Sequence, residues 1–236
     1  MAGWRRIRSI GFSTIGGLLI VGVTLSPSDA RAAQPMQDVR ATVDGIQTII
    51  IDAHQQPDAR KKQGAARLKQ LVSRRFDFLD MAKRALGPYW DKRSQRERNE
   101  YVKVFTEVIE TLYLERMERY AGEHTVYLRE SRDGDYAEVA TKALAVKGDD
   151  LAVNYKVKRA RGGDWKIYDL VIDNVSIVNN YRAQFARILN SGSFDQLLAK
   201  LRDARENQII ARKSRPDRTV LSALLLAQAS SASRPR

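Results

Sequence analysis

The apolar positions of the chain follow a helical period in its first half and an alternating period in its second. Apolar residues recur three and four positions apart over residues 35–54, which predicts an amphipathic helix. The same period predicts further helices over residues 58–75, 78–86 and 95–120. From His124 the period becomes two, which predicts strands near residues 125–130, 136–146, 150–159 and 165–177. Helices are predicted again over residues 178–190 and after Ser193.

Local residue chemistry marks where several of these helices begin and end. Asp77 is placed as the cap of the helix over residues 78–86, and Gly87-Pro88 combines a left-handed residue with a helix stop. Two later helices open with a capping box, in which a serine is followed three residues later by Glu or Gln. These boxes are Ser94 with Glu97 and Ser193 with Gln196.

Short turn sequences separate the predicted strands and indicate the fold class. Asp133-Gly134, Gly148-Asp149 and Gly162-Gly163 are hairpin signals, so the strands form an antiparallel meander. In the third strand apolar and polar residues alternate, which predicts that one face of the sheet is buried and the other is exposed to solvent. We therefore predict an α+β fold, with helices wrapped over one face of a curved antiparallel sheet of about four strands.

The N-terminus has the three parts of a secretory signal. A basic segment ends at Arg8, an apolar segment runs over residues 10–25, and Ala30-Arg31-Ala32 fits a cleavage site. The alternative is a membrane anchor, but the apolar run is shorter than the roughly 20 residues that span a bilayer. We predict a signal peptide over residues 1–32, cleaved to release a soluble protein.

The rest of the chain is predicted to form one domain and a tail. The domain covers residues 33–212, of which 33–120 are mainly helical, 121–177 form the sheet and 178–212 are helical again. Residues 213–236 are rich in Arg, Ser, Pro and Ala, which is typical of a disordered tail. The chain has no cysteine, so disulfides and acylation at a lipobox are excluded, and an exported protein of this kind suits the bacterial periplasm.

The net charge of +13 indicates an anionic partner. Attraction to anionic lipid head groups or acidic proteins is favoured over nucleic acid, because the Lys/Arg-rich segments lack the interleaved aromatics of a single-strand groove. A solvated basic surface is the alternative. The helix over residues 58–75 is a candidate docking face through Arg60, Lys61, Lys62, Arg67 and Lys69.

Candidate catalytic chemistry is sparse in this sequence. It has no P-loop, no dinucleotide-binding glycine motif and no G-x-S-x-G motif. His54 and His124 are its only histidines, so a His/Cys metal site is not expected, nor is any cofactor. Asp169 and Asp173 lie an even number of residues apart on one predicted strand and could form a general-base pair. The alternatives for such carboxylates are a helix cap, a bond to a backbone donor or a salt bridge with Arg182.

Two segments of the chain resemble the signatures of a known family. Residues 76–90 match the pattern F-D-F-x-x-M-A-x-x-x-L-G-x-x-W, which resembles the MlaC, or toluene-tolerance, family of periplasmic phospholipid-binding proteins. A second signature of that family is similar to residues 165–185, and the resemblance extends over residues 75–201 in order and spacing. The matching residues of the second signature are Trp165-Lys166, Tyr168-Asp169, Val175-Ser176, Val178, Asn180-Tyr181-Arg182 and Gln184-Phe185.

The resemblance implies a fold, an activity and a set of partners. The fold is nuclear-transport-factor-like, and its sheet and helices enclose an apolar pocket for acyl chains. The family carries phospholipid between an outer-membrane lipoprotein complex and an inner-membrane ABC transporter, without an enzymatic step. The chain departs from the family pattern at Asp173-Asn174, where Glu-Gly is usual; glycine there implies a positive φ at the end of the strand, which Asn tolerates best after glycine.

We predict that the pocket is lined from the long helix and from the third and fourth strands. The strongest single candidate is Val175, at the bend after the fourth strand. A carrier of hopanoids or other polycyclic lipids, an enzyme of the same fold and a scaffold protein remain alternatives. The predicted lining residues are Tyr101, Phe105, Val108, Val153, Tyr155, Val171, Ile172 and Val175.

Overall fold

Helices and strands follow one another in the order that the hydrophobic pattern predicts. The computed structural model describes residues 34–54, 58–119, 124–144 and 150–214, all within one compact unit. The predicted signal peptide and the predicted tail from residue 215 onward lie outside this part of the chain. The described helices are α1 (Pro35–His54), α2 (Asp58–Arg75), α3 (Phe78–Leu86), the 3-10 turn η2 (Gly87–Tyr89), α4 (Gln95–Arg119), α5 (Ile177–Ser191) and α6 (Phe194–Ser214).

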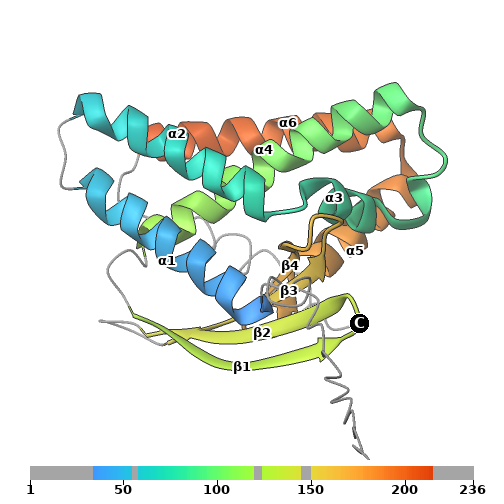
Figure 1. The fold of residues 1–236 in the computed structure, drawn as a ribbon. Coiled ribbons are helices and arrows are strands. Elements are labelled where there is room, and N and C mark those ends of the chain that lie inside the picture. Colours follow the sequence, from blue (N-terminus) through green and yellow to red (C-terminus); the bar gives the residue numbers. More distant parts are fainter. Residues whose placement is uncertain (1–33, 55–57, 120–123, 145–149, 215–236) are drawn as a thin grey trace, which may run out of the picture. The chain divides into compact units, whose positions relative to one another are not determined.

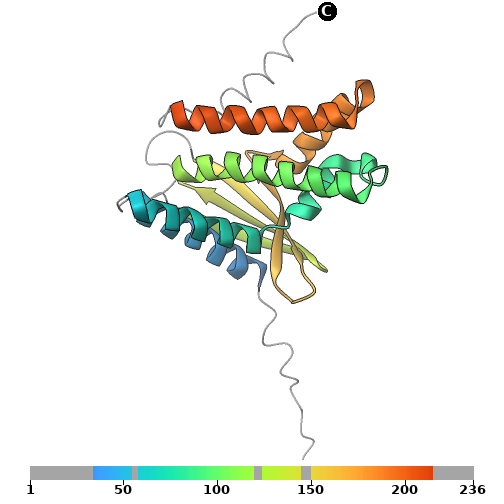
Figure 2. The same ribbon diagram turned by 90° about the horizontal axis from the view of Figure 1, so that it is seen from above.

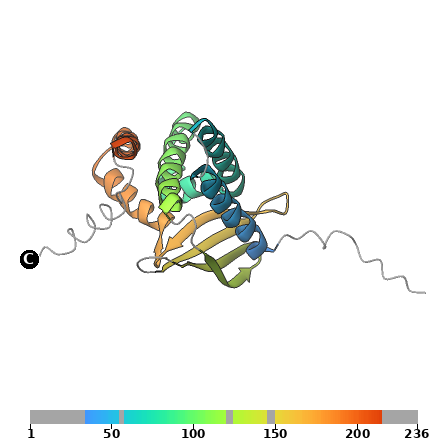
Figure 3. The ribbon, with the colours of Figure 1, turned by 90° about the vertical axis from the view of Figure 1, so that its left-hand side faces the viewer.

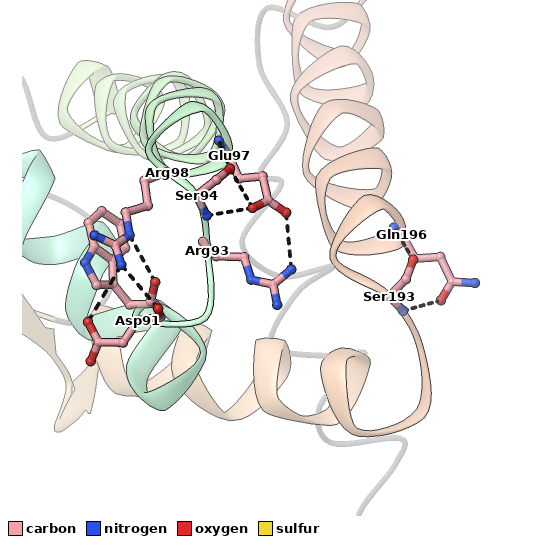
Figure 4. Close-up of polar contacts among 8 residues, drawn as sticks. Asp91, Arg93, Ser94, Glu97, Arg98, Ser193 and Gln196 are labelled. Carbon is pink, nitrogen blue, oxygen red and sulfur yellow. Dashed lines mark hydrogen bonds and ion pairs between the residues drawn. The ribbon is translucent and has the colours of Figure 1, made fainter.

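The predicted helix caps are confirmed by their hydrogen bonds. Asp77 Oδ1 accepts from the backbone N–H of Asp80 at 2.9 Å at the start of α3, and Gly87 has a φ of 58° at its end. At the start of α4 the backbone N–H of Ser94 donates to Glu97 Oε2 at 2.7 Å, and the N–H of Glu97 donates back to Ser94 Oγ at 3.3 Å. Figure 4 shows this box together with the equivalent one at α6, where Ser193 and Gln196 bond each other at 3.1 and 3.2 Å.

The sheet is an open antiparallel meander whose strand order is β1-β2-β3-β4-β5. Its fourth predicted strand, expected to run from 165 to 177, is shorter than predicted. It ends at Ile172, and the chain turns through Asp173 and Asn174, with φ values of 46° and 66°, into a short fifth strand. Positive φ at both central residues is the geometry of a tight two-residue hairpin, which an Asp-Asn pair favours. The strands are β1 (Thr125–Asp133), β2 (Tyr136–Ala143), β3 (Leu151–Arg159), β4 (Trp165–Ile172) and β5 (Val175–Ser176).

An irregularity in β4 changes which of its side chains face the helices. Opposite β3, Val157 pairs with Ile167 but Lys156 pairs with Asp169, so Tyr168 is an extra residue in β4. After this bulge Leu170 and Ile172 return to the face that carries Tyr155 and Val153 of β3. The inner face of β4 is therefore apolar on both sides of the bulge.

The inner face of the sheet packs against α1, which contacts β1, β2 and β4 (Figures 1 and 3). The apolar stripe of α1 that the sequence predicts is buried, and Ile46 at its centre is 1 % exposed. α2 packs on α1 near Gly45, where an added Cβ would lie 3.1 Å from Leu71 Cδ2. A glycine thus allows these two helices to approach closely.

The last helix runs along α4 (Figure 2). Ion pairs cross this seam between Arg202 and Glu100, and between Arg205 and Glu107 at 2.6 Å. Beneath them Phe194, Leu197, Leu198 and Leu201 are buried. Within the described helices, no segment is long and apolar enough to cross a membrane.

Candidate functional site

The two motif segments are far apart in the sequence but meet in space where α3 packs against α5 and β4. We call this region the signature junction, formed by residues 76–90 and 165–190. Phe76 forms a parallel bridge with Ile167, and the N–H of Asp77 donates to the carbonyl of Ile167 at 2.8 Å. The first motif therefore begins as an extension of the sheet edge before it turns into α3.

An arginine from the second motif ties the end of α3 to α5. Arg182 Nε donates to the carbonyl of Arg84 at 2.8 Å, and its side chain lies against the backbone of Gly87. The hydroxyl of Tyr89 donates to Asn190 further along α5. Both contacts join α5 to the end of α3 and the turn that follows it.

A cluster of four charges lies beside this contact. Lys158 Nζ lies 3.0 Å from Asp77 Oδ2 and 2.9 Å from Asp80 Oδ2, and Arg84 Nε lies 3.0 Å from the same Asp80 oxygen. Burial alone would raise the pKa of Asp80, but the hydrogen bonds from Lys158 and Arg84 outweigh it and hold that pKa below its ordinary value. The Arg84 guanidinium also lies 4.4 Å above the ring of Tyr168, so the cluster joins α3 to the sheet.

The two carboxylates predicted as a possible catalytic pair have separate surroundings. Asp169 is 4 % exposed and accepts from Ser176 Oγ at 2.6 Å and from the N–H of Val178 at 3.0 Å, at the start of α5. Asp173 lies in the exposed turn after β4 and accepts from the N–H of Ala152 at 3.2 Å. The expectation that both project from one strand was wrong, because the chain leaves the strand before Asp173. Each carboxylate instead satisfies backbone donors.

Six of the eight predicted lining residues belong to the same cluster of buried apolar side chains. Val153, Tyr155 and Ile172 lie on the inner face of the sheet. Val171 is half-buried and pairs with Asn154, so it lies on the opposite face, and Val175 is 44 % exposed at the start of β5. The remaining three come from α4; they are Tyr101, Phe105 and Val108.

The aromatic residues of α4 pack against α5. The ring centroid of Phe105 lies 5.6 Å from that of Tyr181 and 6.2 Å from that of Phe185, and Tyr181 and Phe185 are 5.4 Å apart. Tyr101 packs edge-on against Phe185 at 6.0 Å and donates its hydroxyl to the carbonyl of Ala82 at 3.0 Å. We call Tyr101, Phe105, Tyr181, Phe185 and Phe194 the aromatic cluster.

Tyr181 and Phe185 are not among the predicted lining residues. Both lie within the second motif and are four residues apart, so on a helix they share one face. That spacing was the available signal. Of the candidate basic docking face, only Arg67 and Lys69 have described side chains, and both are exposed. Among the described residues, no group of three His, Asp or Glu residues could hold a metal ion.

Comparison with known proteins shows which family the chain resembles. A family model described as MlaC protein matches residues 40–203. The intermembrane phospholipid transport system binding protein MlaC of Haemophilus influenzae is 25% identical over 131 residues, which are 54% of this chain and 61% of that protein. The chain thus spans less than two thirds of the length of this curated relative.

A solved structure shows the same fold. It is that of a phospholipid-binding protein from Ralstonia solanacearum in complex with a phospholipid, with a TM-score of 0.65 and 20% sequence identity over 75% of this chain and 99% of that one. This likeness extends the agreement from the sequence motifs to the arrangement of the helices and the sheet. Because the family model covers the described helices and strands from within α1 to within α6, the chain belongs to the MlaC family.

Proposed function

We propose that this protein binds a phospholipid by its acyl chains, between the inner face of the sheet and the helices that cover it. The observation that carries the proposal is the family match over residues 40–203, which includes both signatures and the whole sheet. The names of the Haemophilus and Ralstonia proteins, a phospholipid transport component and a phospholipid-binding protein, support it. The predicted lining residues other than Val171, which lies on the opposite face of the sheet, remain part of the proposal.

The physical demand on such a site is large. Two acyl chains hold about thirty methylenes, and exposing each to water costs about 0.8 kcal/mol, roughly 24 kcal/mol in all. The apolar lining of the pocket must compensate for nearly all of this free energy if the lipid is to leave a bilayer. The buried face formed by Val153, Tyr155 and Ile172, with Phe105 and Val108 on α4, supplies apolar surface of this type.

We further propose that the protein is a periplasmic shuttle. In this proposal residues 1–32 are a cleaved signal peptide, residues 33–212 form the carrier domain, and residues 213–236 are a tail. The partners would be an outer-membrane lipoprotein complex and an inner-membrane ABC transporter, which would supply the direction of transport. The roles of Asp169 and Asp173 as acceptors of structural hydrogen bonds favour this carrier over an enzyme.

Mass spectrometry of organic extracts tests the proposal directly. The full chain would be expressed in a bacterium and the exported protein purified from the periplasm without detergent. We expect near-stoichiometric phospholipid. A polycyclic lipid would replace the phospholipid proposal with the hopanoid alternative, and a folded protein that stays empty when offered liposomes would refute the carrier.

A charge at Val175 tests the least buried of the proposed lining residues. Val175 pairs with Ile172, which is 8 % exposed, so Val175→Glu would place an unpaired charge beside the apolar face. We expect the variant to fold and to retain severalfold less lipid than wild type during purification. Lipid content and circular dichroism would be measured together.

The matched control is Val126→Glu. Val126 is 39 % exposed on β1, at the opposite edge of the sheet from β5. The Val126→Glu variant should fold and retain as much lipid as wild type does. Equal lipid content in the two variants and wild type would remove Val175 from the proposed lining.

A further inference from the structure

The second helix, α2, presents positive charge on the outside of the molecule. Seven of its 18 residues are Lys or Arg and one, Asp58, is acidic. Three of these cations, Arg67, Lys69 and Arg74, have described side chains that are exposed. α2 packs on α1, which lies between it and strands β1 and β2, so the opposite side of α2 is open to solvent (Figures 1 and 3). We call Arg67, Lys69 and Arg74 the α2 face.

The cations of the α2 face lack the acidic partners that many cations of the other helices have. Among the described residues none of the three forms an ion pair, whereas Arg75 at the end of the same helix pairs with Asp38 at 3.2 Å. Glu110 of α4 attracts Lys69 electrostatically but forms no ion pair with it. The α2 face therefore presents charge that the described protein does not neutralise. Pairs on the other helices include Arg84 with Asp80, Arg93 with Glu97, Arg202 with Glu100 and Arg205 with Glu107.

The composition of this face suits a charged plane better than a protein partner. Protein interfaces depend on a few large anchors in a desolvated centre. Over residues 63–75 of α2 no aromatic or large apolar side chain is exposed. An anionic membrane surface attracts Lys and Arg through its surface potential and needs no such anchor. The exposed residues between the cations are Gln63, Ala65, Ala66, Gln70 and Ser73.

We propose that the α2 face docks the protein on the surface of a bilayer that contains anionic phospholipid. This inference goes beyond the proposed function, because it concerns the outside of the protein and does not depend on what the apolar interior binds. Each Lys or Arg held near an anionic surface strengthens binding roughly fivefold, so three of them contribute about a hundredfold. The attraction must weaken with salt, since the screening length falls from about 10 Å at 0.1 M to about 3 Å at 1 M.

Sedimentation of the exported protein with sucrose-loaded vesicles tests this docking surface. One set of vesicles would contain phosphatidylglycerol mixed with phosphatidylcholine, and the other phosphatidylcholine alone. The test variant combines Arg67→Gln, Lys69→Gln and Arg74→Gln, because Gln has a helix propensity close to that of Lys and Arg. Circular dichroism would confirm that it folds as wild type does.

The matched control removes the same net charge from other parts of the surface. It replaces three exposed cations, one each on α3, β1 and α6, that form no ion pair among the described residues. A difference between the two triple variants therefore reports where the charge lies and not how much of it there is. The control substitutions are Lys83→Gln, Arg129→Gln and Lys200→Gln.

We expect the two triple variants to differ in membrane binding. Wild type should sediment with the phosphatidylglycerol vesicles at about 0.1 M salt and be released at about 1 M, and it should not sediment with phosphatidylcholine alone. The α2 variant should bind the anionic vesicles at least about tenfold more weakly than wild type, and the control variant less than about threefold more weakly.

Two outcomes would overturn the proposal. Equal weakening in both triple variants would show that net charge, and not the α2 face, drives binding. Wild-type protein that stays in solution with the anionic vesicles would overturn bilayer docking and leave an acidic protein as the alternative partner of this face. Neither outcome bears on the proposed function, which the lipid retained by the purified protein tests separately, and the α2 variant should retain as much lipid as wild type.

Discussion

The signature junction and the aromatic cluster share Tyr181 and Phe185 of α5, yet different interactions hold them together. At the junction, Asp77, Asp80 and Arg182 each have protein partners at 2.8–3.0 Å. In the aromatic cluster the contacts are mainly between rings, such as those of Tyr181 with Phe105 and Phe185. The junction is therefore held by directional polar contacts, whereas the cluster is held by apolar packing.

The difference between the two regions explains why the family motifs can be recognised from the sequence although the residues that are proposed to bind the lipid cannot. The charged and glycine positions of the motifs are specific in type and spacing because they make hydrogen bonds and a positive φ at the junction. The proposed lipid contacts are ordinary apolar residues, which other residues of similar size could replace. The motifs identify the scaffold, and the site must be located from packing.

The largest expected effect comes from the buried carboxylate at the junction. Asp169→Ala would leave the hydroxyl of Ser176 and the N–H of Val178 without their acceptor at the start of α5. We expect a loss of about 3 kcal/mol in the free energy of unfolding, since two bonds to a charged, buried group are removed. Urea unfolding monitored by circular dichroism would measure it.

The control for this variant is Asp173→Asn, in the exposed turn. Asn keeps an acceptor for the N–H of Ala152 and tolerates the positive φ, so its stability should stay within about 0.5 kcal/mol of wild type. If the two variants were equally stable, the anchoring role of Asp169 would be wrong. Loss of a lipid-modifying activity in both, with folding intact, would instead favour the enzyme alternative.

The second largest expected change in stability concerns the turn between β4 and β5. Asn174 has a φ of 66°, a conformation that glycine adopts freely and a β-branched residue adopts with strain. Asn174→Val should lower the free energy of unfolding by about 1–2 kcal/mol, whereas Asn174→Gly, the residue usual in the family, should change it by less than about 0.5 kcal/mol. A valine variant as stable as the glycine variant would show that the turn is not constrained in this way.

Helix ends could be predicted closely because their signals are local. Ser94 and Glu97 bond each other within one turn of helix, so their spacing alone fixes the start of α4. The break after Ile172 was only partly predicted. Asn174 indicated a positive φ at the strand end, but nothing local showed that the chain would reverse and add β5 to the edge of the sheet.

Positions within the site were harder to predict because they depend on long-range packing. The bulge at Tyr168 changes the alternation of β4, and it is recognised only from the register with β3. Phe105 and Val153 were placed in the interior by their periodicity, and both are buried. The contact of the Tyr181 ring with Phe105 depends on how α5 packs against α4, which the spacing of a single helix does not give.

The smallest expected effect concerns the charge cluster and its pH dependence. Lys158 and Arg84 hold the pKa of Asp80 below its ordinary 3.8, so the folded protein keeps this carboxylate ionised at a lower pH than the unfolded chain does. The stabilisation is therefore fully present above about pH 4 and is lost as pH falls through the lowered value. Asp80→Asn should be less stable than wild type near neutral pH, and the difference should shrink at pH 3.

Partial exposure limits the size of this effect. The side chains of Arg84 and Lys158 are 34% and 26% exposed, so solvent screening should keep the difference within about 1 kcal/mol. Urea midpoints from pH 7 to pH 3 would measure it, with Asp91→Asn as the control, since Asp91 is 87% exposed and 3.9 Å from Arg98 (Figure 4). The control should follow the wild-type pH profile. If Asp80→Asn followed it too, the ion pairs of Asp80 would not stabilise the junction.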